Sequence, residues 1–235
     1  MSGTVTSRIG RVLGYDGPVA ALVLTVFQYF LLSASFIACL APVLVFQALV
    51  GWQSTHLALW LGAASLLTLA PAVQALCVAA AVLLDDGAGA RVGRVFWSAF
   101  AGAVRTRWGA SLAVSGIVLV LGYDIALLGS DAGMLMSALA IAAAAGAILL
   151  AAAFAAGEGD DRRGLALVTA AARLAVMRPH LALVWLLLAA LGAFATSLPV
   201  VGAIAWFSAP ALSAVAAVIC NRTLGFASAL ERVTA

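Results

Sequence analysis

The polar side chains that could do chemistry in this sequence are few, and each lies inside or at the end of a long apolar stretch. Asp124 follows Tyr123 near the end of one stretch, and Gln74 lies three residues after Pro71 in another. A carboxylate within a membrane segment is a functional candidate, and a proline kink beside a glutamine can line a solute path. The alternatives are an Asp124 that reaches water at its helix end and a Pro71 kink that serves packing alone. The candidate functional residues are Pro71, Gln74, Tyr123 and Asp124.

Other chemistries need residue sets that this sequence does not hold. It contains no P-loop, paired-histidine zinc motif, nucleophile elbow or CxxC pair. His56 and His180 are predicted on opposite membrane faces and so cannot share a site; His56 is expected to be a solvated turn residue. Cys39, Cys77 and Cys220 share no motif spacing and are expected to be small buried hydrophobic side chains. We therefore expect no catalytic site, no metal and no cofactor.

The composition identifies the solvent of this protein. Hydrophobic residues make up 66% of the chain and charged residues 9%, whereas soluble domains carry about 25% charged residues. Most of the surface must therefore face lipid, and we expect one integral membrane domain over residues 1–235. The net charge of +3 comes from arginines spread over four short segments, with no solvated domain to present them. This pattern is an orientation signal and does not favour nucleic-acid binding.

The uncharged stretches are too long to be single membrane helices. A helix crosses about 30 Å of hydrocarbon with about 20 residues. The stretches 17–84 and 179–221 contain no charged residue, so each must fold back. Polar or glycine-rich turns at 51–56, 129–133 and 199–202 divide the chain into an all-α bundle of six transmembrane helices in three hairpins. The predicted spans are 24–50, 57–84, 108–128, 133–156, 180–198 and 203–221. We expect the alanine-rich fourth span to lie centrally, because small side chains permit close packing.

The arginines predict which side of the membrane each turn occupies. Each hairpin returns the chain to the side that it left, so both termini and both connectors share one side, and all twelve basic residues are arginines on that side. Arginine at mid-span costs about 2.5–3.5 kcal/mol, and basic loops stay cytoplasmic. We therefore predict cytoplasmic N- and C-termini. The arginine-only basic set and the abundant alanine indicate a GC-rich bacterial genome and hence the bacterial inner membrane.

Two connectors on the arginine side have the pattern of interfacial helices. Between residues 91 and 108, apolar side chains recur at helical spacing with arginines off that stripe. A second such helix is expected at 165–177, before the fifth span. Arginines near anionic headgroups contribute about 1 kcal/mol each. The alternatives are a basic loop that only sets topology and a docking surface for a cytoplasmic partner. The candidate partner or lipid contacts are Arg91, Arg94, Phe96, Trp97, Phe100, Arg105 and Arg107.

Three short motifs, in order, resemble the YesL-like family of bacterial multi-pass membrane proteins. Residues 71–76 (PAVQAL) resemble the family's Pro-Ala-x-x-Ala-Leu element, residues 94–100 (RVFWSAF) its Phe-Trp connector, and residues 121–124 (LGYD) a polar cluster late in its third span. Residues 175–188 match the start of its fifth span more loosely. Family connectors are often rich in lysine, and this chain has arginine alone.

The resemblance implies a supporting role without a defined chemistry. Members of the family are often encoded beside carbohydrate ABC importers, so a non-enzymatic accessory role in sugar uptake is expected, with the bilayer and such an importer as partners. The sequence does not show the Glu-Ala-Ala coupling loop of an importer permease. The alternative is a small transporter or channel whose path is lined by kinked helices, and that alternative requires a polar cavity.

Overall fold

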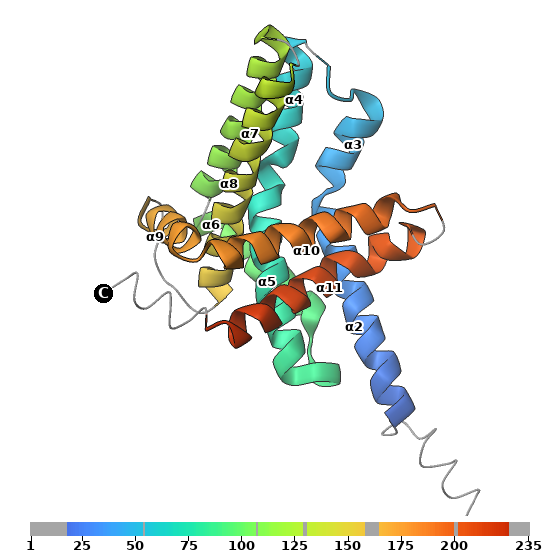
Figure 1. The fold of residues 1–235 in the computed structure, drawn as a ribbon. Coiled ribbons are helices and arrows are strands. Elements are labelled where there is room, and N and C mark those ends of the chain that lie inside the picture. The colour runs from blue at the N-terminus through green and yellow to red at the C-terminus, as the bar shows by residue number, and fades with distance from the viewer. Residues whose placement is uncertain are drawn as a thin grey trace, which may run out of the picture.

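The computed structural model describes residues 18–53, 55–106, 108–128, 131–157, 165–199 and 202–225, and these form helices joined by short turns (Figure 1). Within those ranges, six helices are long and apolar enough to cross a membrane, so the predicted all-α polytopic fold is confirmed. The helices are α2 (Pro18–Cys39), α3 (Ala41–Leu49), α4 (His56–Ser65), η1 (Leu66–Thr68), α5 (Leu69–Asp86), η2 (Gly87–Gly89), α6 (Val92–Thr106), α7 (Trp108–Leu128), α8 (Ala132–Gly157), α9 (Leu165–Met177), α10 (Pro179–Ser197) and α11 (Gly202–Thr223).

Both arms of the first hairpin are interrupted within their length. The span predicted at 24–50 begins earlier, at Pro18, and is interrupted between α2 and α3, where Pro42 occupies the first turn of α3. A proline fits that position because the first turn needs no N–H donor. In the return arm, α4 passes through the tight turn η1 into α5, with Pro71 in the first turn of α5. Each proline thus lies at the start of a helix, and at Pro71 the sequence had predicted a kink within one.

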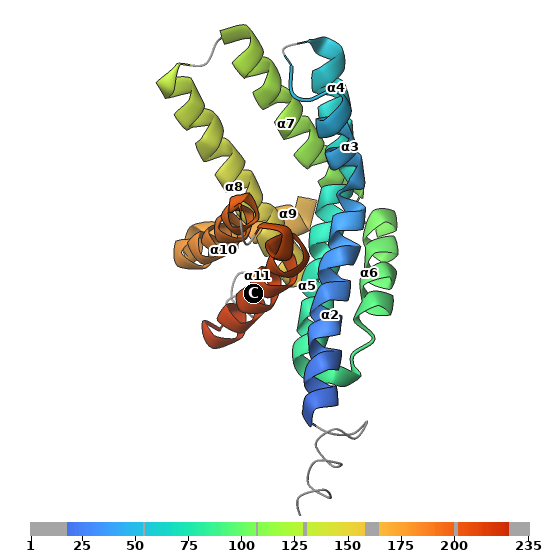
Figure 2. The same cartoon turned by 90° about the vertical axis from the view of Figure 1, so that its right-hand side faces the viewer.

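Helix α5 is the centre of the bundle. Its alanines Ala72, Ala75, Ala79 and Ala80 are fully buried, and α2, α6, α8 and α11 all pack against it. Small side chains allow these neighbours to approach closely. The expectation that the fourth span, α8, lies centrally was wrong: the first half of α8 exposes Leu135, Met136, Leu139 and Ile141. Figure 2 shows why, because that half of α8 leans away from the other helices.

The third hairpin runs across the direction of the first two. Figure 1 shows α10 and α11 side by side, crossing α5 at a steep angle. The turn between them is close, because Gly202 N–H donates to the Leu198 carbonyl at 2.7 Å and a Cβ at Gly202 would lie 2.7 Å from the Thr196 carbonyl oxygen. Next to Pro210, the Ala211 N–H donates to Ser33 Oγ of α2 at 3.2 Å, which ties this hairpin to the first.

The ends of α5 and α11 meet in an ion pair. Arg222 donates two hydrogen bonds to the Asp85 carboxylate, at 2.7 and 3.0 Å. The paired geometry of two N–H groups on two carboxylate oxygens is the most directional that arginine makes. Two helix ends that the arginine pattern assigns to the same membrane side are therefore neighbours.

Candidate functional site

Helix α6 has one face built into the bundle and one face left outside. Val92 and Phe96 are fully buried and Ala103 is 2% exposed, because this stripe packs on α5 and α2. Gly93 makes the approach possible, since a Cβ there would meet the Leu31 side chain of α2 at 3.0 Å. A helix therefore occupies the connector where an interfacial helix was predicted, and packing on α5 and α2 anchors it to the bundle.

The opposite face of α6 presents cations and an aromatic ring. We define the α6 surface as the exposed side chains Arg91, Arg94, Trp97 and Arg105. Phe96, predicted as a contact, is buried beneath this surface and so is unavailable to a partner; Phe100 is half-buried. Arg107, also predicted, lies outside the described residues. The structure thus brings most of the predicted contact residues onto one helix face.

Two phenylalanine rings hold the exposed Trp97 in place. The Trp97 ring centroid lies 5.6 Å from that of Phe96 and 5.8 Å from that of Phe100, both in edge-to-face geometry. Such pairs contribute about 0.5–1.5 kcal/mol beyond area burial. Trp97 is nevertheless 47% exposed. A rigid, half-exposed tryptophan flanked by arginines results.

The predicted candidates inside the apolar part separate into two places. Pro71 is buried and Gln74 half-buried in α5, where they line a void of about 20 Å³ together with Ala110, Ala153 and three neighbours. About 10–15 Å³ accommodates one water, which needs two to four polar partners. Gln74 is the only polar side chain of this lining. The void therefore has room for about one water molecule, and it does not form a path for a solute.

Tyr123 and Asp124 lie elsewhere, near the C-terminal end of α7. The Tyr123 hydroxyl and His56 Nδ1 of α4 are 2.8 Å apart, and the two ring centroids are 5.5 Å apart. His56 is exposed, as predicted, but it is a partner of a candidate residue and not merely a solvated turn residue. Sequence reasoning missed this pair, although both residues were assigned to the same membrane side. The pair joins α4 to α7, and Asp124 is half-buried one residue beyond it.

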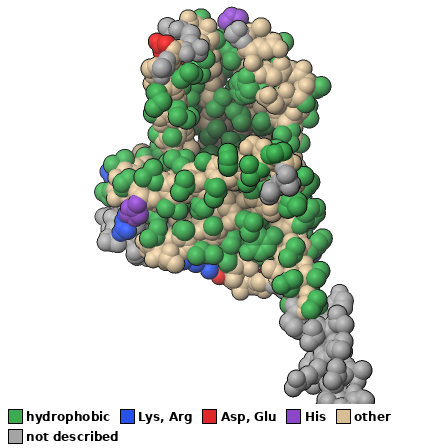
Figure 3. Space-filling model, turned by 45° about the vertical axis from the view of Figure 1, so that its right-hand side comes forward, with side chains coloured by type: hydrophobic (Ala, Val, Ile, Leu, Met, Phe, Trp, Pro, Cys, Tyr) green, Lys and Arg blue, Asp and Glu red, His purple; other side chains and the backbone are tan. Residues whose placement is uncertain are grey.

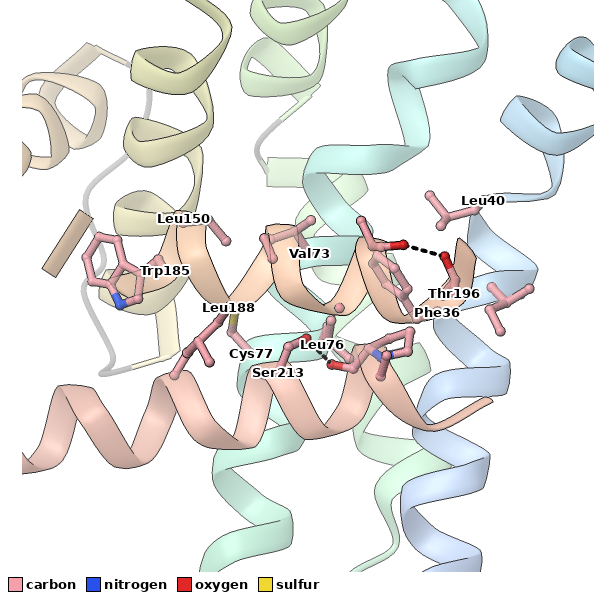
Figure 4. Close-up of a pocket in the computed structure, with 18 of the residues that line it drawn as sticks. Phe36, Leu40, Val73, Leu76, Cys77, Leu150, Trp185, Leu188, Thr196 and Ser213 are labelled. Carbon is pink, nitrogen blue, oxygen red and sulfur yellow. Dashed lines mark hydrogen bonds between the residues drawn. The ribbon is translucent and has the colours of Figure 1, made fainter. Parts of the chain in front are cut away.

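A large cavity lies between the third hairpin and α2, α5 and α8 (Figure 4). Its volume is about 340 Å³, and Trp185, Leu188 and Thr196 of α10 face Val73, Leu76 and Cys77 of α5 across it. Figure 3 shows the surface hollowed above the third hairpin, with hydrophobic side chains around the recess. The sequence carried a signal for it: the lining positions of α10 and of α11 each recur every three or four residues.

No cluster of potential metal ligands occurs in the part of the chain that the structure describes. No three His, Cys, Asp or Glu side chains gather there, and the buried polar pairs are structural, such as Trp185 Nε1 donating to Asn221 Oδ1 at 2.7 Å. Comparison with protein-family models, with curated proteins and with solved structures finds no match to this chain. The YesL-like resemblance therefore stays a prediction.

Proposed function

We propose that this integral membrane protein is a non-enzymatic accessory component, and that the α6 surface is the part it offers to a partner. The observation that supports this is the division of α6 into a face fixed in the core and a face of exposed arginines around Trp97. A basic loop that only set topology would not need Val92 and Phe96 fully buried beneath it.

The chemistry of the α6 surface suits a protein or headgroup contact. Arginine, tryptophan and tyrosine dominate the residues that carry binding energy at interfaces. Trp97 is held by two ring contacts, so little side-chain entropy is lost when a partner covers it. Arg91, Arg94 and Arg105 favour an acidic partner surface. By the arginine pattern, this surface lies on the cytoplasmic side.

The partner that we propose is a carbohydrate importer of the bacterial inner membrane. This step rests on the resemblance of residues 71–76, 94–100 and 121–124 to the YesL-like family. A role as an independent transporter has less support. It requires a polar path, whereas the large cavity is lined almost wholly by carbon and the small one has only Gln74 as a polar side chain.

Affinity purification from native membranes tests this function. The test variant combines Trp97→Ala with Arg94→Glu on the α6 surface. The matched control combines Trp60→Ala on α4 with Arg173→Glu on α9, since both of those residues are exposed as well. Interface anchors contribute about 2 kcal/mol or more, so recovery of importer subunits should fall more than tenfold in the test variant only.

Two results would contradict parts of the proposal separately. If importer subunits are never recovered, but another membrane protein is recovered in a Trp97-dependent way, only the carbohydrate link is lost. If every recovered protein is insensitive to the α6 substitutions, the accessory role of the α6 surface is lost.

A further inference from the structure

The large cavity has the shape of a slot along the third hairpin. Its lining from α10 runs from Trp185 to Thr196 on one face of that helix, and its lining from α11 runs from Trp206 to Ala217 on one face of the other. Each of these faces covers eleven residue steps, which at 1.5 Å rise span about 16 Å. Dividing the volume of about 340 Å³ by this length gives a mean cross-section of about 20 Å². The slot is therefore long and narrow.

The slot exists because the hairpin crosses its neighbours. Helices that cross steeply contact each other at one place and diverge on either side, so they cannot fill the space along their lengths. Small residues widen the gap: Ala189, Gly192 and Ala193 on α10 oppose Ala209 and Ala214 on α11. Cavities that bind ligands have roughly 300–1,000 Å³, and this one is in that range.

Two hydroxyls and one indole N–H of the lining make their hydrogen bonds within the protein. Thr196 Oγ1 donates to the Ala193 carbonyl at 2.7 Å and Ser213 Oγ to the Pro210 carbonyl at 3.0 Å (Figure 4). Trp185 Nε1 donates to Asn221 Oδ1 at 2.7 Å. A sugar or ion in the slot would lose its water without gaining enough partners, which is costly. A hydrocarbon chain would lose nothing and would gain dispersion contacts with the walls.

The outer face of the same hairpin is continuous with the lipid-facing surface. Leu187, Leu191 and Phe194 are exposed on α10, and Ile204 and Leu212 on α11. In a membrane protein these side chains meet acyl chains, so the hydrocarbon most abundant beside the slot is phospholipid. We propose that the slot binds one acyl chain of a membrane phospholipid. This site goes beyond the proposed accessory function and uses no residue of the α6 surface.

Photocrosslinking with a phospholipid that carries a diazirine in one acyl chain tests the site. The full chain is reconstituted with this lipid, transferred to detergent to remove loosely bound lipid, irradiated, and mapped by mass spectrometry. We expect adducts on slot residues such as Leu188 and Cys77. Adducts confined to outward residues such as Leu187 and Leu191 would overturn the proposal.

A substitution that fills the slot provides a second test of the lipid site. A Cβ at Gly192 has only ordinary contacts, 3.8 Å from Ala209 and Ser213, so Gly192→Leu places its remaining carbons in the slot. We expect Gly192→Leu to lower slot adducts at least fivefold. Gly116→Leu, on an exposed face of α7 with nothing within 4 Å, should leave them unchanged.

Two further results decide against the proposal. Equal slot labelling in Gly192→Leu and the wild type would overturn it. So would slot labelling by a diazirine fatty acid but not by the diazirine phospholipid, since the occupant would then be a free fatty acid. If circular dichroism shows that Gly192→Leu is unfolded, the wild-type adduct map alone decides.

Discussion

The Thr68 hydroxyl donates a hydrogen bond of 2.7 Å to the Cys39 carbonyl, and it thereby joins the two breaks in the first hairpin. Cys39 is the last residue of α2, and Thr68 ends the tight turn between α4 and α5. A helix end in lipid needs a partner for its carbonyls, because no water is present to supply one. Thr68 thus donates from the return arm of the hairpin to the end of α2 in the opposite arm.

Replacing Thr68 with valine should destabilise the bundle. The substitution keeps the shape and removes the donor to Cys39. Side-chain hydrogen bonds within membrane proteins contribute about 0.6 kcal/mol on average and up to about 1.7, so we expect a loss of about 1 kcal/mol in unfolding free energy in detergent. Thr25→Val is the matched control, since Thr25 bonds only to Ala21 of its own helix. Equal effects of the two variants would contradict the cross-hairpin role.

The Tyr123–His56 pair should couple α4 to α7 energetically. Tyr123→Phe removes the hydroxyl and His56→Ala removes its partner. A net hydrogen bond contributes about 0.5–1.5 kcal/mol, so a double-mutant cycle should give a coupling of about 0.5–1 kcal/mol in thermal unfolding. Strict additivity of the two variants would show that the contact contributes nothing to stability.

We expect the buried Trp185–Asn221 hydrogen bond to contribute more to stability than the Tyr123–His56 contact. Trp185→Phe removes the Nε1 donor and leaves the Asn221 oxygen without it in an apolar interior. Leaving a buried polar group unsatisfied costs about 1–3 kcal/mol, and we expect a loss of that size. Trp60→Phe on an exposed face of α4 is the control, with an expected change below about 0.5 kcal/mol. The measurement is the midpoint of thermal unfolding.

Two glycine substitutions should change the free energy of unfolding in opposite directions. Gly202→Ala brings a Cβ to 2.7 Å from the Thr196 backbone oxygen, which cannot move aside easily, so we expect a loss of about 1–3 kcal/mol. Gly116→Ala meets nothing within 4 Å and gains helix propensity, up to about 1 kcal/mol. A neutral Gly202→Ala would show that the turn between α10 and α11 is looser than its geometry requires.

Hydropathy and charge were sufficient to predict the helices of the second and third hairpins, but not the breaks in the first hairpin. The third span was predicted at 108–128 and α7 is Trp108–Leu128, while the fourth to sixth spans differ from α8, α10 and α11 by one or two residues at each end. These boundaries follow from local rules, because a membrane helix must be long, apolar and free of charge.

The arrangement of the helices could not be predicted in the same way. Apolar composition predicts that a helix is shielded from water. It does not predict whether lipid or other helices of the protein cover it. Helices α5 and α8 are both rich in alanine, and only α5 is central. The crosswise third hairpin and the slot beside it depend on contacts of α10 and α11 with α2, α5 and α8. The spacing of the lining residues marks one face of each helix, but it does not predict what that face packs against.

The candidate sites also differ in how far the sequence could predict them. The α6 surface was predictable because its stripe is local to one helix, although Phe96 had to be reassigned from the surface to the core. The Tyr123–His56 pair joins residues 67 positions apart, and only the folded chain brings them together.

The membrane topology is the claim on which the proposed cytoplasmic role of α6 depends, and cysteine labelling tests it most directly. In a background with the native cysteines replaced, Ser98→Cys places a thiol on exposed α6 and Gln53→Cys places one in the exposed turn before α4. A membrane-impermeant maleimide applied to intact spheroplasts should label Gln53→Cys at once and Ser98→Cys only after permeabilisation. Labelling of Ser98→Cys in intact spheroplasts would contradict the account.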